Sequence, residues 1–313
     1  MIDVIGVPFD LCGSRPGCAL GPAAVRYAGL VETLQGIGLE VRDCGDMPAM
    51  RPETDEDGMR NFPPLLETVR GLRKAVYKTY LEGNLPIVVG GEHTVVAGAV
   101  AAALQFHGED VAVLWIDAHA DANTPGSSAS GNLHGMPIAA LAGLPSGTEG
   151  KVDEEWNALQ EALGSGPRLS LNRTAWYALR DVDPPEVPQL QGLALTMHDI
   201  DRHGVVNTMH TLDRWLRTIG ASHLWISFDV DALDPILAPG TGTAVRGGLT
   251  YREAHLCAEL LFEMMAASDC PYRLAGVDVV ETNPLVDANN ATAVMVVEWF
   301  ASLFGKTILG SRR

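Results

Sequence analysis

The chain has 313 residues, of which 47% are hydrophobic and 19% are charged, and its formal net charge is −17. This composition supplies a large core, and the acidic balance argues against nucleic acids and anionic membranes as partners. Five cysteines, an odd count without zinc-type spacing, indicate a reduced, cytoplasmic chain. The N-terminus predicts a strand and no signal peptide, and no apolar run reaches the roughly 18 residues of a transmembrane helix.

Strand-like apolar runs alternate with helical, periodic stretches along the whole chain. The expected strands are Ile2–Val7, Leu39–Asp43, Leu85–Val89, Val111–Ile116, Thr174–Leu179, Leu193–Met197, His223–Phe228 and Leu274–Val280. The expected helices are Ala23–Gln35, Pro64–Glu82, Thr94–Phe106, Glu154–Leu163, Met209–Ile219, Tyr251–Met265 and Ala288–Phe304. Such alternation is typical of a mostly parallel sheet covered by helices on both faces. We therefore expect one three-layer α/β/α domain over residues 1–313, with about eight strands.

Three short runs of carboxylates and histidines each follow one of these strands. They are Gly90-Gly91-Glu92-His93, Asp117-Ala118-His119-Ala120-Asp121 and Asp229-Val230-Asp231. In a parallel α/β sheet the carboxyl ends of the strands form one edge, and ligands bind there. Six side chains should therefore meet: His93, Asp117, His119, Asp121, Asp229 and Asp231.

Such a cluster predicts bound cations. Four crowded carboxylates cannot all ionise without compensation, and a pair of divalent cations supplies it. Two imidazoles among many carboxylate oxygens favour Mn²⁺ over Zn²⁺. Each run alone is compatible with a purely structural role, whereas the three together indicate a metal site. Two metals roughly 3.5–4 Å apart can activate a shared water, so the default interpretation is a hydrolase.

Two further residues suit such a reaction. His134 lies in the glycine-containing loop Ser130–Gly135, where an imidazole that is not a metal ligand can act as a general acid or proton shuttle. Glu281 follows the strand Leu274–Val280 and can pair with a cationic substrate. Taken alone, each residue fits a plain surface or capping role better than a catalytic one.

The ordered motifs resemble the ureohydrolase family of arginases, agmatinases and their relatives. The similarity runs from Gly6-Val7-Pro8-Phe9-Asp10-Leu11 to Ser302-Leu303-Phe304-Gly305. Within the family, four segments resemble the arginase branch: Asp121-Ala122-Asn123-Thr124-Pro125, Ser130-Gly131-Asn132-Leu133-His134-Gly135, Arg180-Asp181-Val182-Asp183-Pro184 and Gly240-Thr241-Gly242-Thr243. The resemblance implies a dimanganese enzyme that hydrolyses L-arginine to L-ornithine and urea by attack of a metal-bridging hydroxide.

The resemblance also implies a role for each site residue. One Mn²⁺ would be held by His93, Asp117, Asp121 and Asp229, and the other by Asp117, His119, Asp229 and Asp231. The substrate α-carboxylate would contact Asn123, Ser130 and Asn132, and the α-ammonium would contact Asp183 with Asp181 behind it. Glu281 would hold the guanidinium, Thr243 would support the pocket, Asp121 would also orient the hydroxide, and His134 would carry the proton to or from the leaving amine. The family further implies a homotrimer or homohexamer.

Some positions depart from the family pattern, and alternatives remain. Glu92 stands where aspartate is more usual, and Cys12 and Cys18 occupy an N-terminal loop that usually carries other residues. One alternative is a ureohydrolase of agmatine or guanidinobutyrate. Agmatine lacks the α-carboxylate, so the complete carboxylate-binding set favours arginine, because a site built for a polar group rejects an analogue without it. The other alternative, a non-catalytic metal-binding homologue, is disfavoured because all six ligands are present.

Overall fold

The structure is a computed structural model that describes residues 1–53 and 57–311. Eight strands form one sheet in the order β2-β1-β3-β8-β7-β4-β5-β6, and every neighbouring pair is parallel. The strands are β1 (Ile2–Gly6), β2 (Val41–Asp46), β3 (Leu85–Val89), β4 (Val111–Ile116), β5 (Thr174–Leu179), β6 (Leu193–Thr196), β7 (His223–Asp229) and β8 (Arg273–Val280). A small antiparallel pair, β9 (Lys306–Thr307) and β10 (Gly310–Ser311), follows near the C-terminus.

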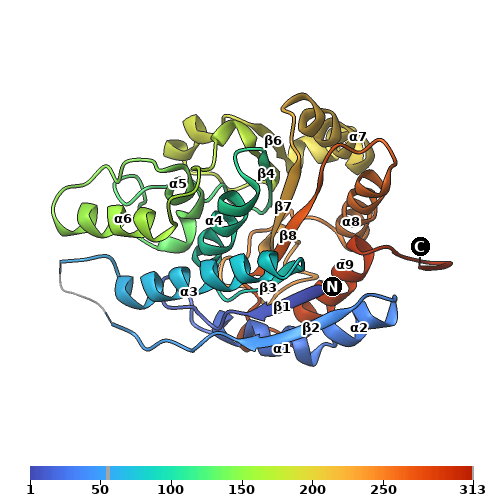
Figure 1. The fold of residues 1–313 in the computed structure, drawn as a ribbon, viewed down its shortest axis with the longest axis horizontal. Coiled ribbons are helices and arrows are strands. Elements are labelled where there is room, and N and C mark those ends of the chain that lie inside the picture. Colours follow the sequence, from blue (N-terminus) through green and yellow to red (C-terminus); the bar gives the residue numbers. More distant parts are fainter. Residues whose placement is uncertain (54–56, 312–313) are drawn as a thin grey trace.

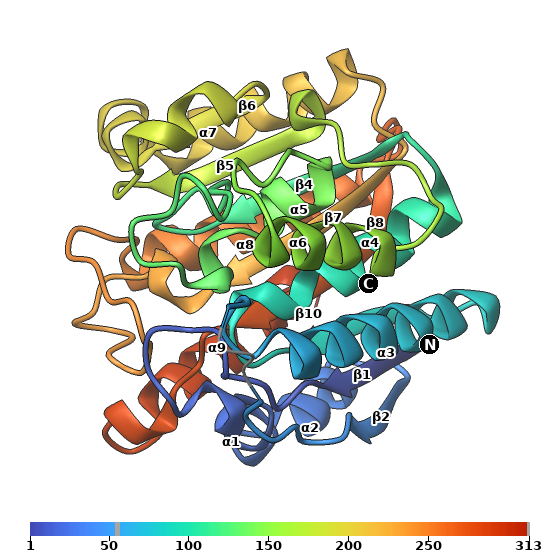
Figure 2. The ribbon, with the colours of Figure 1, turned by 90° about the vertical axis from the view of Figure 1, so that its left-hand side faces the viewer.

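Helices cover both faces of the sheet (Figure 1). One face packs against α1 (Gly21–Tyr27), α2 (Leu30–Gly36), α7 (Met197–Thr218), α8 (Tyr251–Ala266) and α9 (Ala291–Leu303). The other face packs against α3 (Phe62–Leu81), α4 (Val96–His107), α5 (Pro137–Ala142) and α6 (Lys151–Ala162). Figure 2 looks onto this second face and shows α3, α4 and α6 lying across the sheet. The expected three-layer α/β/α architecture is confirmed.

Burial explains why the central strands have the sequences they do. All six residues of β4 are buried, and β7 is buried after its first residue. Strands covered on both faces read as continuous apolar runs and lose the usual alternation. The edge strand β2 is polar and mostly exposed, as expected for an edge that must not pair with another chain.

The helices differ from the expected ones in three places, and one of these is the short helix α5, which was not expected. The expected helix over Ala23–Gln35 is divided into α1 and α2, because Gly29 adopts φ 91°, a left-handed conformation that interrupts a helix and favours glycine. Helix α7 begins at Met197, twelve residues before the expected start at Met209. A kink at Gly204, which has φ 76° and ψ 156°, separates its first turns from the expected helix. These turns bury Met197 and Ile200, and Thr196 and Asp199 form a capping box that starts them.

The sheet places the ends of its four central strands side by side. Strands β3, β8, β7 and β4 are consecutive neighbours and all run in the same direction, so their carboxyl ends open on one edge. The three histidine- and aspartate-containing runs and Glu281 follow these four strands. Within residues 1–53 and 57–311, no helix combines the length and apolar character that a membrane crossing requires.

Candidate metal centre and substrate pocket

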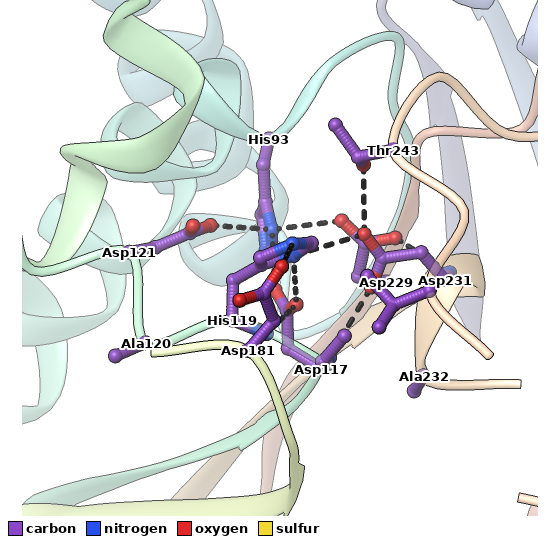
Figure 3. A network of polar contacts seen from close by, with 12 residues as sticks. His93, Asp117, His119, Ala120, Asp121, Asp181, Asp229, Asp231, Ala232 and Thr243 are labelled. Atoms are coloured by element: carbon purple, nitrogen blue, oxygen red, sulfur yellow. Dashed lines mark hydrogen bonds and ion pairs between the residues drawn. The ribbon is translucent and has the colours of Figure 1, made fainter. Parts of the chain in front are cut away.

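The candidate metal centre lies at the carboxyl ends of β3, β4 and β7. His93 opens the short 3-10 helix η2 (His93–Val95) after β3, and Asp229 is the last residue of β7. Asp231 lies in the 3-10 helix η6 (Val230–Ala232), whereas Asp117, His119 and Asp121 lie in the bent loop after β4, in which Asp121 has φ 51°. All six predicted ligands are therefore brought together, as Figure 3 shows for the labelled side chains.

The first group of ligand atoms surrounds Nδ1 of His93. This nitrogen lies 3.1 Å from Oδ2 of Asp117, 2.9 Å from Oδ2 of Asp121 and 3.2 Å from Oδ2 of Asp229. All four side chains are buried, and their donor atoms point toward one another (Figure 3). The ligand atoms of His93, Asp117 and Asp229 lie close enough together for one divalent cation, and Asp121 approaches the same nitrogen of His93.

The second group surrounds Nδ1 of His119. It lies 3.3 Å from Oδ1 of Asp117 and 3.1 Å from Oδ2 of Asp231. Asp117 therefore contributes one oxygen to each group. Asp229, which was also expected to bridge, has its second oxygen engaged differently, because its Oδ1 accepts a hydrogen bond of 2.8 Å from the backbone N–H of Asp231.

A buried polar relay fixes the tautomer of His93. The Ser227 hydroxyl donates to Asp278 Oδ1 at 2.8 Å, and the same hydroxyl oxygen lies 2.8 Å from His93 Nε2. Since the single hydroxyl proton goes to Asp278, Ser227 can only accept from Nε2–H. In the neutral ring, which is the form that binds a metal, the lone pair of His93 is then on Nδ1, which faces the carboxylates. The ring is also stacked on Trp115, with centroids 4.0 Å apart.

The pKa values of the cluster show that its buried carboxylates repel one another. Burial, with repulsion from neighbouring carboxylates, raises the pKa of Asp121 to about 6 and also raises the pKa values of Asp229 and Asp231. Burial lowers the pKa of His93, but the adjacent carboxylates of Asp117, Asp121 and Asp229 outweigh this and raise the pKa well above its usual range. Without a cation the site thus retains protons in order to balance its negative charge.

The residues present fit a pair of divalent cations. Within the described part of the chain, His93 Nδ1 and Asp117 Oδ2 are buried without a hydrogen-bond partner. Buried polar atoms without partners are costly, and a metal ion would satisfy both. The donor set of two imidazoles and four carboxylates suits a hard or borderline divalent cation.

A cleft of about 220 Å³ opens above this cluster. The cluster forms its floor, through His93, His119, Asp121, Asp229 and Asp231. The wall and rim comprise the predicted residues Asn123, Ser130, Asn132, His134, Asp181, Asp183 and Thr243, together with Ser14, Ser128, Gly135 and Glu186. One pocket therefore collects most of the expected metal ligands and substrate-binding residues, whereas Asp117 and Glu281 are not among the residues that line it.

His134 and Glu281 form a pair beside the floor. Nδ1 of His134 lies 3.0 Å from Oε1 of Glu281, and the Glu281 side chain is buried behind the ring. Burial lowers the pKa of His134, but the hydrogen bond and negative charge of Glu281 outweigh it and raise the pKa to about 9. Glu281 adopts φ 61°, an unusual backbone conformation for a residue other than glycine that often marks functional sites.

The wall of the pocket is built by side-chain hydrogen bonds between two loops. The Asn123 amide donates to Asp183 Oδ2 at 2.9 Å, and its Oδ1 accepts from Ser127 at 2.8 Å. Thr243 donates to Asp231 Oδ2 at 2.8 Å, which links the pocket wall to the second ligand group. Asp181 is 67% exposed and its Oδ2 lies 3.9 Å from His119 Nε2, so it stands over the floor.

Comparison with known proteins decides the family. The sequence model of the Arginase family matches residues 1–305. The arginase of Bacillus caldovelox is 37% identical over 317 residues, covering 98% of this chain and 99% of that protein. The chain belongs to the arginase family.

Solved structures of arginases have the same fold as this chain. The Bacillus caldovelox arginase structure covers 98% of this chain and 99% of its own, with a TM-score of 0.87. The arginase of Entamoeba histolytica, solved in complex with L-ornithine, is 25% identical with a TM-score of 0.81, covering 97% and 98% of the two chains. As a member of the arginase family, the chain is a ureohydrolase.

Two supporting residues of this arginase-family pocket were missed in the sequence. Glu186 is buried and accepts hydrogen bonds from the backbone N–H groups of Ala122 at 2.8 Å and Asp183 at 2.9 Å, which ties the two loops together. The spacing of Asp183 and Glu186 is a capping-box pattern that signals the bond to Asp183, whereas nothing in the sequence signals the bond to Ala122. Asp278, in contrast, interrupts the apolar strand β8, and a carboxylate at a buried strand position is a readable signal of a partner in the core.

Proposed function

We propose that the chain hydrolyses L-arginine to L-ornithine and urea with two Mn²⁺ ions. The observation that carries this proposal is the composition of the single cleft. Its floor holds two imidazole–carboxylate groups, and its wall holds the Asn123–Asp183 pair. The first feature suits chemistry on a cationic, planar guanidinium, and the second suits the zwitterionic end of an amino acid.

The proposed ligands are His93, Asp117, Asp121 and Asp229 for one ion, and Asp117, His119, Asp229 and Asp231 for the other. We infer Mn²⁺ because carboxylate oxygens outnumber the imidazoles, a donor set that suits Mn²⁺ better than Zn²⁺. When bound, two such ions supply Lewis acidity and lower the pKa of an attacking water toward neutrality.

The chain's own groups position the reacting atoms and move the proton. Asp121, whose Oδ2 lies 2.9 Å from His93 Nδ1, is part of the floor and can orient the attacking water. The Nδ1 of His134 is engaged by Glu281, so Nε2 is the ring nitrogen left to give a proton to the leaving amine. A pKa of about 9 keeps that proton available at neutral pH.

Glu281 is the proposed partner of the guanidinium. Its Oε1 accepts from the backbone N–H of His93 at 3.1 Å and contacts His134. Each carboxylate oxygen has two lone pairs, so Oε2 retains acceptor capacity on the side of Gly242. Burial alone would raise the pKa of Glu281, but His134 lowers it below its usual range, so the group stays anionic.

The amino-acid end of the substrate is assigned to the pocket wall and rim. Asp183 would bind the α-ammonium group, with Asp181 nearby at the rim, and Asn123, Ser130 and Asn132 would bind the α-carboxylate. The arginase of Entamoeba histolytica was solved with L-ornithine, which supports an amino-acid ligand for the family. Thr243 would hold Asp231 in place from the pocket wall.

The test is urea release by Mn²⁺-loaded protein from arginine, agmatine and guanidinobutyrate, measured side by side. The proposal expects the highest kcat/KM with arginine. Preference for either of the others would keep the metal chemistry and overturn the assignment of the wall residues. Absence of urea from all three, with two metals bound, would favour a non-catalytic role.

We further infer a cytoplasmic, homotrimeric or homohexameric protein, from the reduced cysteines and the family resemblance. All five cysteines are free. Sedimentation or light scattering of the Mn²⁺-loaded protein measures the mass, and a monomer or dimer would contradict the inference. Localisation is checked by fractionation of the source cells.

A further inference from the structure

The N-terminal segment brings a buried thiol to the carboxylate of Glu281. Cys18 opens the 3-10 helix η1 (Cys18–Leu20), and its Sγ lies 3.2 Å from Oε2 of Glu281. Cys18 is 1% exposed and Glu281 is 2% exposed. The contact therefore lies in the protein interior, where a hydrogen bond to a charged group is stronger than it is in water.

The Cys18 contact and the other hydrogen bonds of Glu281 engage different carboxylate oxygens. The backbone N–H of His93 and the ring of His134 both engage Oε1, at 3.1 and 3.0 Å. The Cys18 thiol engages Oε2. The terminal torsion of a glutamate is broad and poorly defined by itself, so a carboxylate anchored at both oxygens has a fixed plane, whereas one anchored only at Oε1 can rotate.

The thiol is in the protonation state that such an anchor requires. Burial raises the pKa of Cys18, and the neighbouring charge of Glu281 raises it further. The sulfur therefore carries its proton and acts as a donor to the carboxylate. A thiolate at this position would repel Glu281.

We propose that Cys18 is a positioning residue that fixes the carboxylate plane of Glu281 and, through it, the ring of His134. Its effect on turnover rests on the proposed function above, whereas the hydrogen bond itself does not. Cys18 would then contribute to the orientation of the proton-carrying nitrogen, in addition to filling space under η1.

The remaining buried cysteines offer a contrast within the same chain. The Sγ of Cys12 points to the backbone carbonyl of Arg60 at 3.3 Å, and the Sγ of Cys257 lies 3.5 Å from the sulfur of Met209 in the core between α7 and α8. Cys257 is fully buried and belongs to the core cluster on the far face of the sheet. It is the matched control for loss of a buried sulfur away from the site.

The kinetic test compares Cys18→Ala, Cys18→Ser and Cys257→Ala in urea release from arginine. We expect Cys18→Ala to lower kcat about tenfold, because an ordinary hydrogen bond to a charged group accounts for about that factor. Cys18→Ser restores a donor and should recover kcat to within about threefold of wild type. Cys257→Ala should lower the melting temperature without lowering kcat. Equal kcat values for Cys18→Ala and Cys257→Ala would overturn the proposal.

A spectroscopic test does not depend on turnover. The S–H stretching band of Cys18, assigned by its loss in Cys18→Ala, should lie at lower frequency than that of a free thiol, and it should rise in Glu281→Gln because an amide is a weaker acceptor. The ¹⁵N signals of the His134 ring, assigned by their loss in His134→Asn, should shift in Cys18→Ala. If wild type releases no urea, the proposed function fails, and these two spectra decide the inference: a free-thiol band or an unshifted His134 signal overturns it.

Discussion

The floor and the rim of the pocket are built in different ways. The floor residues His93, Asp117 and Asp229 follow or end strands of the sheet and are at most 3% exposed. The rim residue Asp181 is 67% exposed on a loop, and Ser130 lies in an exposed loop after β4. Rigid elements position a demanding coordination site, whereas loops carry the contacts that can vary with the substrate.

The two regions also differ in their electrostatics. At the floor, the raised pKa values of His93, Asp121, Asp229 and Asp231 show an excess of negative charge. At the wall and rim, polar groups already satisfy one another, as Asn123 does with Asp183 and Ser127. The floor should therefore depend on bound cations, and the rim should not. The predictions below test this division, beginning with the largest expected effect.

Removal of the metals should abolish urea release completely, and Mn²⁺ should restore it. Carboxylates beside His93 and His119 raise the pKa values of both rings against the effect of burial, so the metal-free site holds protons at pH 7. Metal binding must displace them, and affinity should fall as the pH falls. Titration calorimetry in buffers of different ionisation enthalpy measures the released protons. Binding at pH 7 without proton release would contradict this account of the floor.

Asp231→Ala should remove one ligand of the second group and lower kcat by at least about a thousandfold, because charge stabilisation by a metal contributes several kcal/mol. The bound Mn²⁺ should fall from two ions to one per subunit, as measured by elemental analysis. Asp201→Ala, an exposed carboxylate on α7, is the control and should keep both ions. Full activity with two bound metals in Asp231→Ala would show that the residue is not a ligand.

Sequence reasoning predicted which side chains lie together at the floor, because the sheet supplies its geometry. The strand ends that carry His93, Asp117 and Asp229 are visible as polar runs after apolar segments, and parallel strands bring such runs to one edge. Support from distant positions was not visible. The Ser227–Asp278 relay depends on the register of β7 with β8, in which these two residues are direct neighbours.

The rim was less predictable for the same physical reason. Its loops take their shapes from side-chain hydrogen bonds, such as those that Glu186 accepts from Ala122 and Asp183. No periodicity encodes such bonds. Their residues were found only through resemblance to the ureohydrolases, and the contacts of Cys18 with Glu281 and of Arg60 with Asn132 appeared only in the structure.

His134→Asn tests the boundary between the two regions. His134 lines the pocket but coordinates no metal in the proposed assignment, so the variant should bind two Mn²⁺ ions while kcat falls about a hundredfold, a typical loss for a general acid. His203→Asn, an exposed histidine on α7, is the control and should behave as wild type. Loss of metal from His134→Asn would move the residue from the boundary to the floor.

Asp183→Ala tests the wall and rim without changing a residue of the floor. Losing the carboxylate that faces the α-ammonium should raise KM for arginine about 10–100-fold, because that charge pair is lost in ground and transition states alike. The value of kcat should change less than about threefold, since the floor is untouched. Guanidinobutyrate, which has no α-ammonium group, should bind the variant and wild type equally, measured as KM or as an inhibition constant. Ser130→Ala is the complementary control, because Ser130 is assigned to the α-carboxylate. It should raise KM for arginine but not for agmatine, which lacks that group. If Asp183→Ala weakened the binding of arginine and of guanidinobutyrate equally, the variant would disturb the Asn123 loop as a whole. The floor and the rim would then be coupled rather than separate.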